Sequence, residues 1–300
     1  MDSDKQRALF EVLERLKEAF KKISEELRDN GNVCMGVGSS NAFGEDQLKA
    51  DVFSDETILE ALRGKCKVAI SEETPQPQNM GGEHFTVTFD PLDGSSIIDT
   101  NFSVGTIFGI WDTEEIIGAS GRDLVFSGLV VYGSRTTLLT EEKQSPLSKE
   151  LAESSVSEYT LIKGSWVRTK QNLQIASATK MFAPANLRAT VGHPGYKELV
   201  AQWQGAGYTL RYTGGMVPDI YQIFIKGHGV FSNPTSRQAP AKLRVLYESA
   251  PVARLVEVAG GKTYSEGGSV LDIIVESYEQ KTGMCVGSSE EVQKFIDLVG

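Results

Sequence analysis

Hydrophobic residues recur at helical spacing over the start of the chain. They are separated by charged residues and stand at Leu9, Val12, Leu13, Leu16, Phe20, Ile23 and Leu27. This spacing predicts an amphipathic helix that ends near Gly31, a residue suited to a helix C-terminus. The Gly- and Ser-rich residues 32–44 predict a loop, and a second helical pattern follows through Ile58, Leu59 and Leu62.

Short apolar or alternating runs then predict strands. They lie at residues 67–71, 85–89, 104–111, 128–132 and 136–139. The last three are expected to form an antiparallel meander. The polar residues 141–157 show no buried pattern and predict an exposed connection.

The second half of the chain alternates between helical and strand patterns. Helices are expected at residues 196–204, after Pro218 and at 245–259, and strands at 208–212, 229–231 and 284–287. Ser288 and Glu291 have the spacing of a capping box for a final helix. The alternation is typical of α/β proteins, and we expect two domains, residues 1–176 and 177–300.

The composition narrows the classes of partner and compartment. The chain has 300 residues, 23% of them charged, and a formal net charge of −10. This charge argues against nucleic acid or an anionic membrane surface as a partner. No run approaches the roughly 18 apolar residues of a membrane span. The N-terminus lacks the apolar core of a secretion signal, so we expect a cytoplasmic protein, with a plastid protein lacking its targeting segment as the alternative.

The strongest chemical signal is the segment DPLDGSS at residues 90–96. Asp90 and Asp93 supply two carboxylates, the proline between them restricts the backbone, and the glycine after them permits a sharp turn. The two serines then offer N–H groups and hydroxyls to an anion. Because Mg²⁺ binds oxygen ligands, usually a few carboxylates together with substrate phosphate oxygens, the segment indicates a place where Mg²⁺ is held against a phosphate.

Each of the other motifs also has a purely structural interpretation. The acidic pair at residues 72–73 is either a solvated surface or, because it ends an apolar strand, a partner of the Asp90 segment. The loop Arg211–Met216 is a tight turn or a phosphate clamp. Lys242 and Arg244 are phosphate ligands or solvated charges at a helix start, where Glu248 would form an i,i+4 ion pair with Arg244.

Two common metal sites are excluded by residue spacing. In an EF-hand loop starting at Asp90, the third and fifth positions need oxygen-bearing side chains but hold Leu92 and Gly94. A zinc site is not expected, because the three histidines and three cysteines are scattered without ligand spacing. The cysteines are expected to be reduced thiols.

Taken in order, the motifs resemble the fructose-1,6-bisphosphatase family. They are SEE at 71–73, DPLDGSS at 90–96, VGTIFGIW at 104–111, RYTGGMVPD at 211–219 and KLRVLYE at 242–248. DGSSIIDTNFSVGTIFG, MFAPANLRAT and RYTGGMVPD look closer to the sedoheptulose-1,7-bisphosphatase branch of that family. The resemblance implies stacked α/β/α/β/α layers with the active site between two domains. It also implies a phosphoric monoester hydrolase of carbohydrate metabolism, acting in the Calvin cycle or on pentose phosphate pools, which removes the 1-phosphate of sedoheptulose 1,7-bisphosphate.

The resemblance further implies roles for individual residues. It implies two to three Mg²⁺ ions per active site, with Mn²⁺ as an alternative. The residues that match the metal ligands of the family are Asp46, Glu72, Asp90, Leu92 through its carbonyl, Asp93 and Glu248. The pair that activates the attacking water matches Asp51 and Glu73. The substrate contacts match Gly94, Ser95, Ser96, Asn186, Arg211, Tyr212, Gly214, Met216, Lys242 and Arg244. Arg211 is implied to reach a neighbouring subunit's site, in a homodimer or homotetramer.

Some positions depart from the family pattern. The sugar-phosphate motif Asn-x-x-Tyr reads here as Asn186-Leu187-Arg188-Ala189, so Arg188 is a candidate for part of the distal-phosphate contact. A redox cysteine pair of plant-type members is matched by Cys34, but its second position holds Ser39, so no disulfide switch is expected. The alternatives are a fructose-1,6-bisphosphatase or dual-specificity enzyme, and a non-catalytic sugar-phosphate-binding regulator.

Overall fold

The computed structural model describes residues 2–40, 46–113 and 115–300. Its helices are α1 (Asp2–Asp29), α2 (Lys49–Leu62), α3 (Pro194–Gly205), α4 (Met216–Lys226), α5 (Ala250–Val258) and α6 (Ser289–Val299). Its strands are β1 (Gly36–Ser40), β2 (Asp46–Leu48), β3 (Val68–Ser71), β4 (Gln78–Asn79), β5 (Thr86–Asp93), β6 (Val104–Trp111), β7 (Leu124–Tyr132), β8 (Thr136–Lys143), β9 (Ser154–Ile162), β10 (Ser165–Leu173), β11 (Met181–Pro184), β12 (Thr209–Leu210), β13 (Val230–Asn233), β14 (Lys262–Tyr264) and β15 (Met284–Gly287).

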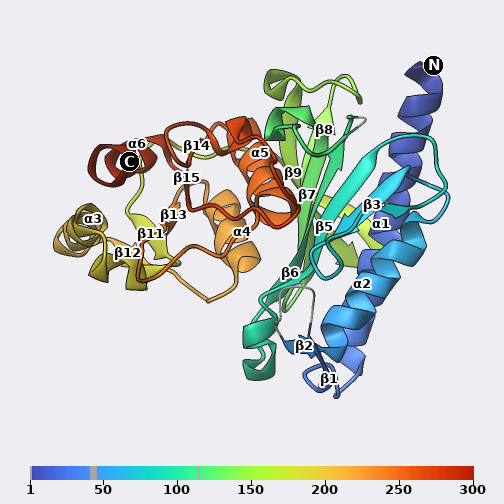
Figure 1. Cartoon of the computed structure of the whole chain (residues 1–300), viewed down its shortest axis with the longest axis horizontal. Coiled ribbons are helices and arrows are strands. Elements are labelled where there is room, and N and C mark those ends of the chain that lie inside the picture. Colours follow the sequence, from blue (N-terminus) through green and yellow to red (C-terminus); the bar gives the residue numbers. More distant parts are fainter. Residues whose placement is uncertain (1, 41–45, 114) are drawn as a thin grey trace.

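These elements form five layers in which two sheets alternate with helices (Figure 1). α1 and α2 cover the outer face of the large sheet, while α4 and α5 lie between the two sheets. α3 and α6 cover the far side of the small sheet. The predicted α/β/α/β/α arrangement is confirmed.

The large sheet has the strand order β10-β9-β8-β7-β6-β5-β3-β4. Its neighbours are antiparallel except for β3 and β5, which run parallel. Every residue of β6 and β7 is buried, because helices cover both faces of the sheet there. The predicted meander is confirmed for these strands and β8.

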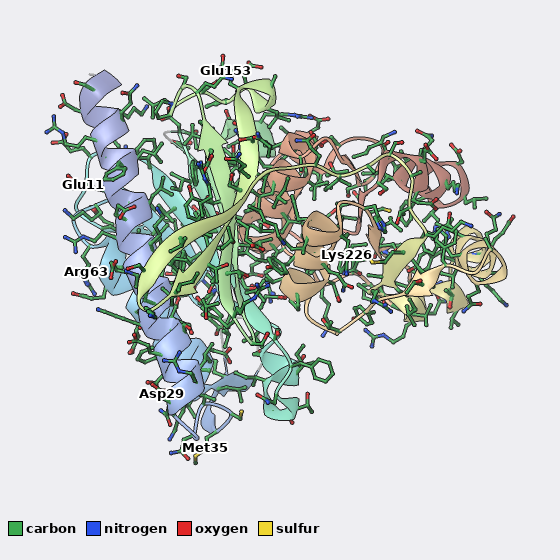
Figure 2. The ribbon with its side chains drawn as sticks, turned by 180° about the vertical axis from the view of Figure 1, so that it is seen from behind. Glu11, Asp29, Met35, Arg63, Glu153 and Lys226 are labelled. Atoms are coloured by element: carbon green, nitrogen blue, oxygen red, sulfur yellow. The ribbon has the colours of Figure 1, made fainter. Side chains whose placement is uncertain are left out.

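The opening helix packs against this sheet as its apolar stripe predicts. Leu16, Phe20 and Ile23 are fully buried, and the Phe20 ring lies 5.5 Å from the ring of Phe108 on β6. Figure 2 shows α1 from behind, lying along the sheet from Glu11 to Asp29. No helix among the residues described here is long and apolar enough to span a membrane.

Two predicted loops are wrong in part. Residues 144–153 do connect two strands, but the predicted exposed connection at 141–157 also includes the end of β8 and the start of β9, and Glu141 is fully buried. Polar residues hide the strand pattern here; the buried Glu141 carboxylate, for example, accepts hydrogen bonds from the Ser127 N–H and the Arg254 guanidinium. Residues 36–40, predicted as loop, form β1 and pair with β2. Residues 41–44 of that predicted loop lie outside the described residues.

The small sheet has the order β12-β11-β13-β15-β14, with β11 parallel to β12 and β13. The final helix begins after Ser288, but the predicted capping box is wrong. Ser288 accepts a hydrogen bond from the Gly229 N–H, while Glu291 accepts from the Trp203 indole and the Tyr208 hydroxyl. Both side chains are therefore occupied by tertiary contacts.

Candidate active site

The segment with the strongest chemical signal begins as the end of β5 rather than as a free loop. Asp90 pairs with Ile107 of β6. Asp93 pairs with Gly105, so β5 has one more residue than β6 between these pairs. Such a β-bulge bends a strand and redirects its side chains. The predicted loop at residues 90–96 is therefore corrected: its first four residues belong to the strand.

A turn at Gly94 ends the strand. Gly94 has φ 87°, in the left-handed region that glycine adopts most readily. The chain then enters a 3₁₀ helix, η1 (Ser95–Thr100), whose first two serines face the same cavity as the bulge. The sequence DPLDGSS thus places carboxylates and hydroxyls side by side.

Three carboxylates from distant parts of the sequence converge beside the bulge. Glu72, Asp90 and Glu248 are buried, and each offers an oxygen that lies within 4.8 Å of the other two. Glu72 directly follows β3, and its N–H bonds to the Phe89 carbonyl at 3.0 Å. Glu248 lies in a π-helical turn, Val245–Ser249, that leads into α5. All three are predicted metal ligands.

The electrostatics of this cluster suit a bound cation. Burial raises the pKa of Asp90 well above its usual range, and the neighbouring Glu72, Asp93 and Glu248 carboxylates raise it further. Burial and the Glu72 carboxylate likewise raise the pKa of Glu248. Close buried carboxylates repel one another unless they take up protons or a cation. The oxygen donor set and its repulsion therefore fit a divalent metal ion that prefers oxygen ligands.

Arg244 is also part of this cluster. It is buried, and its guanidinium pairs with Glu72, while its backbone N–H donates to Glu248 at 2.6 Å. The alternative interpretation of Arg244 and Glu248 as a simple side-chain ion pair on a helix is therefore wrong. The guanidinium reaches back to the end of β3 instead.

Asp93 joins the bulge to the middle helix layer. Its carboxylate accepts hydrogen bonds from the N–H groups of Val217, at 2.7 Å, and Met216, at 3.4 Å, in the first turn of α4. Burial raises the pKa of Asp93 to about 6, although these two amides favour the charged form. The predicted metal ligand Asp93 thus also anchors α4.

The carboxylate of Asp51 interacts with that of Glu73. Asp51, in the first turn of α2, accepts a hydrogen bond from the Leu48 N–H at 2.8 Å. Burial raises its pKa to about 7, and the Glu73 carboxylate adds to the shift. Glu73 itself accepts a hydrogen bond from the Gln47 side chain at 2.6 Å. The predicted catalytic pair is thus close enough to interact, with Asp51 the more buried member.

These groups surround a cavity of about 600 Å³, which we call the acidic cavity. Among the predicted site residues it is lined by Glu72, Glu73, Asp90, Leu92, Asp93, Gly94, Ser95, Ser96, Gly214, Lys242 and Glu248. Lys242 is exposed and brings a positive charge to this acidic wall. A phosphate ester could therefore meet Lys242 and the serines while a cation meets the carboxylates.

Of the other predicted residues, those whose side chains the structure describes do not line this cavity. Tyr212 is half-exposed and donates its hydroxyl to the Ala185 carbonyl at 3.1 Å, and Met216 is buried under Asp93. Arg188 and Arg211 are exposed. The amide nitrogen of Asn186 is used within the chain, donating to the carbonyls of Pro234 and Ala239. The backbone of Asp46 opens β2, and its side chain lies outside the described atoms.

Sequence reasoning missed three acidic residues. Asp55 stands one helical turn after Asp51 and is buried beside it, so the i,i+4 spacing on α2 was an available signal. Asp99 lines the acidic cavity from η1. The two carboxylate oxygens of Asp219 accept hydrogen bonds from the Thr213 N–H, at 2.9 and 3.1 Å. These bonds hold the loop Arg211–Met216 in place before α4.

Comparison with known protein families matches nearly the whole chain. Residues 2–163 match the family described as "Fructose-1-6-bisphosphatase, N-terminal domain". Residues 175–300 match "Fructose-1-6-bisphosphatase, C-terminal domain".

Individual relatives agree with this match. The chloroplastic sedoheptulose-1,7-bisphosphatase of Chlamydomonas reinhardtii is 44% identical over 95% of this chain and 72% of its own length. The class 1 fructose-1,6-bisphosphatase of Pelobacter propionicus is 34% identical over 88% of this chain and 81% of its own. The crystal structure of Leishmania major fructose-1,6-bisphosphatase in its holo form superposes with a TM-score of 0.87 and 28% identity, covering 97% of this chain and 94% of that one.

Proposed function

Because the chain belongs to the fructose-1,6-bisphosphatase family, we propose that its acidic cavity hydrolyses the 1-phosphate of sedoheptulose 1,7-bisphosphate, giving sedoheptulose 7-phosphate and inorganic phosphate. The chain is a phosphatase that acts on a phosphate monoester. Its identity of 42–44% to sedoheptulose-1,7-bisphosphatases over nearly its full length supports the seven-carbon substrate. The observation that carries the proposed mechanism is the convergence of Glu72, Asp90 and Glu248 beside Ser95 and Ser96.

The family is metal-dependent, and we propose that this chain uses Mg²⁺, with Mn²⁺ as the alternative. One ion would be held by Glu72, Asp90, Asp93 and Glu248, and a second by Glu72, Asp90 and the Leu92 carbonyl. Asp46 and Glu72 would hold a third, looser ion. When bound, such ions neutralise charge on the transferring phosphoryl group and on the leaving oxygen.

The side chains of the cavity then position the reacting groups. Asp51 and Glu73 would accept the proton of the attacking water, a role favoured by the raised pKa of Asp51. The Gly94 N–H with Ser95 and Ser96 would hold the 1-phosphate. Glu73, Gly94, Ser95 and Ser96 line the acidic cavity, and Asp51 interacts with the Glu73 carboxylate from α2.

The distal half of the sugar would lie against the C-terminal part of the chain. Its contacts are proposed to come from Asn186, Arg188, Tyr212, Gly214, Met216, Lys242 and Arg244. The family acts on sugar bisphosphates and is generally oligomeric, and we propose a homodimer or homotetramer in which Arg211 reaches a neighbouring site. The exposed apolar side chains of Leu210 and Tyr212, which flank Arg211 in the sequence, support an interface there.

Two further assignments belong to the proposal. The chain is divided into a metal-binding domain, residues 1–176, and a sugar-phosphate-binding domain, residues 177–300. This division is supported by the large sheet, which ends at Leu173, and the small sheet, which begins at Met181. We place the protein in the cytoplasm, with the plastid as the alternative because several relatives are chloroplastic.

The test is phosphate release from sedoheptulose 1,7-bisphosphate and fructose 1,6-bisphosphate, measured side by side with and without Mg²⁺. We expect kcat/KM for the seven-carbon sugar to exceed kcat/KM for fructose 1,6-bisphosphate by at least about tenfold. A binding pocket can discriminate to this extent between substrates that differ by one carbon unit. Equal values would make the enzyme dual-specific, and a preference for fructose 1,6-bisphosphate would reverse the assignment. If no phosphate is released from either sugar, the alternative of a non-catalytic sugar-phosphate-binding regulator would be favoured.

A matched pair of variants tests the metal cluster. Glu248→Gln should remove Mg²⁺-dependent activity and the increase in Tm that Mg²⁺ causes, while raising the Tm of the metal-free protein because one of three repelling carboxylates is gone. The exposed Glu150→Gln should leave all three measurements unchanged. A Glu248→Gln protein that keeps its Mg²⁺-induced rise in Tm would contradict the proposed ligand set.

A further inference from the structure

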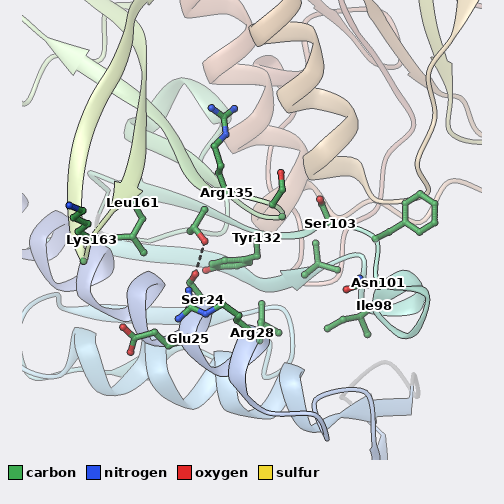
Figure 3. A pocket seen from close by; sticks show the side chains of 17 residues that line it. Ser24, Glu25, Arg28, Ile98, Asn101, Ser103, Tyr132, Arg135, Leu161 and Lys163 are labelled. Atoms are coloured by element: carbon green, nitrogen blue, oxygen red, sulfur yellow. Dashed lines mark hydrogen bonds between the residues drawn. The ribbon is translucent and has the colours of Figure 1, made fainter.

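A second cavity, of about 990 Å³, lies on the other side of η1 and differs in charge from the acidic cavity. We call it the basic cavity. Among the described residues that line it, the charged ones are Arg28, Arg135, Lys163 and Glu25. It is thus net positive in a chain whose net charge is −10. Figure 3 shows the three basic residues on different sides of the cavity, from the end of α1, the β7–β8 turn and the β9–β10 turn.

The positive charges are available to a ligand. Arg135 and Lys163 form no ion pair with any residue that the structure describes. Within the described part of the chain, the ion-pair partner of Arg28 is its sequence neighbour Asp29, and both side chains are about two-thirds exposed, so that pair is weak. Positively charged side chains that line a cavity and lack strong ion-pair partners favour the binding of an anion there.

The other lining groups also suit phosphate. Hydroxyls of Ser103, Ser134 and Thr136 line the same cavity, and guanidinium groups bind phosphate oxygens through two parallel hydrogen bonds. The cavity is at the upper end of the range seen for small-molecule sites. The three basic residues lie on different sides of the cavity, which suits a ligand that carries more than one phosphate group (Figure 3).

The basic cavity shares its walls with the active site. Ser95, Ser96 and Asp99 of η1 line the acidic cavity, whereas Ile98 and, just beyond η1, Asn101 line the basic one. A hydrogen-bonded chain makes a second connection. The Tyr132 hydroxyl in the basic cavity wall lies 2.9 Å from the Thr106 hydroxyl, which donates to the Pro91 carbonyl inside the β-bulge at 2.8 Å.

We propose that the basic cavity is a second ligand site, which binds a small molecule carrying at least two separated phosphate groups. Its occupant touches η1 and Tyr132, so binding acts on the segment that positions the catalytic carboxylates and serines. The site does not depend on which sugar bisphosphate the acidic cavity hydrolyses.

The experiment measures binding of fructose 1,6-bisphosphate, as a bisphosphate probe, to the full chain in EDTA by titration calorimetry. Without metal the acidic cavity repels an anion, so binding reports on the basic cavity. We expect the double variant Arg28→Ala/Lys163→Ala to weaken binding at least tenfold. Lys242→Ala in the acidic cavity and the exposed Arg63→Ala should each change it less than twofold.

Two controls separate binding from folding and from catalysis. Arg28 and Lys163 are exposed, so the double variant should keep the wild-type Tm. It should also keep the wild-type phosphatase rate with Mg²⁺ in the absence of added ligand. The proposal is overturned if no binding is seen up to about 5 mM probe, weaker than a typical metabolite site. It is also overturned if Lys242→Ala removes the binding and the double variant does not.

Discussion

The buried ion pair between Arg254 and Glu141 gives a quantitative prediction about stability. Arg254 of α5 donates through Nε and Nη2 to the two Glu141 oxygens of β8, at 2.8 and 3.1 Å, and both side chains are fully buried. The Ser127 N–H and hydroxyl donate to the same carboxylate. The pair therefore holds the middle helix layer against the large sheet.

Arg254→Met would leave Glu141 buried with Lys143 as its nearest cation, at 3.6 Å. Burial lowers the pKa of Lys143 to about 8, so this lysine is a poor substitute for a guanidinium. Removing one partner of a buried pair costs about 3–5 kcal/mol. With an unfolding entropy of about 2.1 cal/mol/K per residue, this loss corresponds to a Tm lower by about 5–8 °C.

The assay is differential scanning calorimetry of the metal-free protein at pH 7, with a control from the same strand. Glu142 follows Glu141 and pairs with Arg168, whose side chain is 48% exposed. Arg168→Met should therefore lower Tm by only a small fraction of the Arg254→Met shift. Replacing both buried partners, as Glu141→Met/Arg254→Met, should recover much of the loss. Equal shifts for the two arginine variants would refute the reasoning.

Two further changes test the site and the domain contact. Because burial raises the pKa of Asp51 from 3.8 to about 7, the stability it contributes is complete below pH 3.8 and is lost as the pH rises through 7. In urea unfolding of the metal-free protein, Asp51→Asn should therefore gain stability relative to wild type between pH 4 and 7.5, on the order of 4 kcal/mol; a difference that does not change with pH would contradict this. Gly105→Ala would push a methyl group into the Val217 side chain and the Val130 carbonyl. We expect it to destabilise the fold by about 1–3 kcal/mol and to lower activity by displacing α4 from Asp93, and unchanged Tm and kcat would refute the close approach.

The sequence predicted the apolar elements well because their burial requires hydrophobic side chains. The α1 stripe and the strands β5, β6 and β7 are such cases. It did not predict β9 and β10. β10 is an exposed edge strand with no buried face, and β9 buries Glu158, which is satisfied by the Thr169 and Tyr221 hydroxyls. Polar pairing of this kind depends on distant residues.

The candidate site shows the same limit. The DPLDGSS segment could be found because its residue types belong together within a few positions. The partner of Arg244 could not, because Glu72 is 172 residues away in the sequence, and the local Glu248 looked equally suitable. Asp93 was predicted as a ligand, but its bonds to α4 depend on how the helix packs against the bulge.

Those bonds have a consequence for how the two halves of the molecule communicate. A carboxylate has about four positions at which it can accept bonds, and α4 uses two of those on Asp93. If Asp93 binds a cation as proposed, that cation and the helix of the opposite half would share a single side chain. Because such coupling is reciprocal, the free energy by which the cation changes the Asp93–α4 contact would equal the free energy by which the position of α4 changes cation binding. A substitution far from the cavity on α4 would then be expected to change metal affinity without altering any of the proposed ligands.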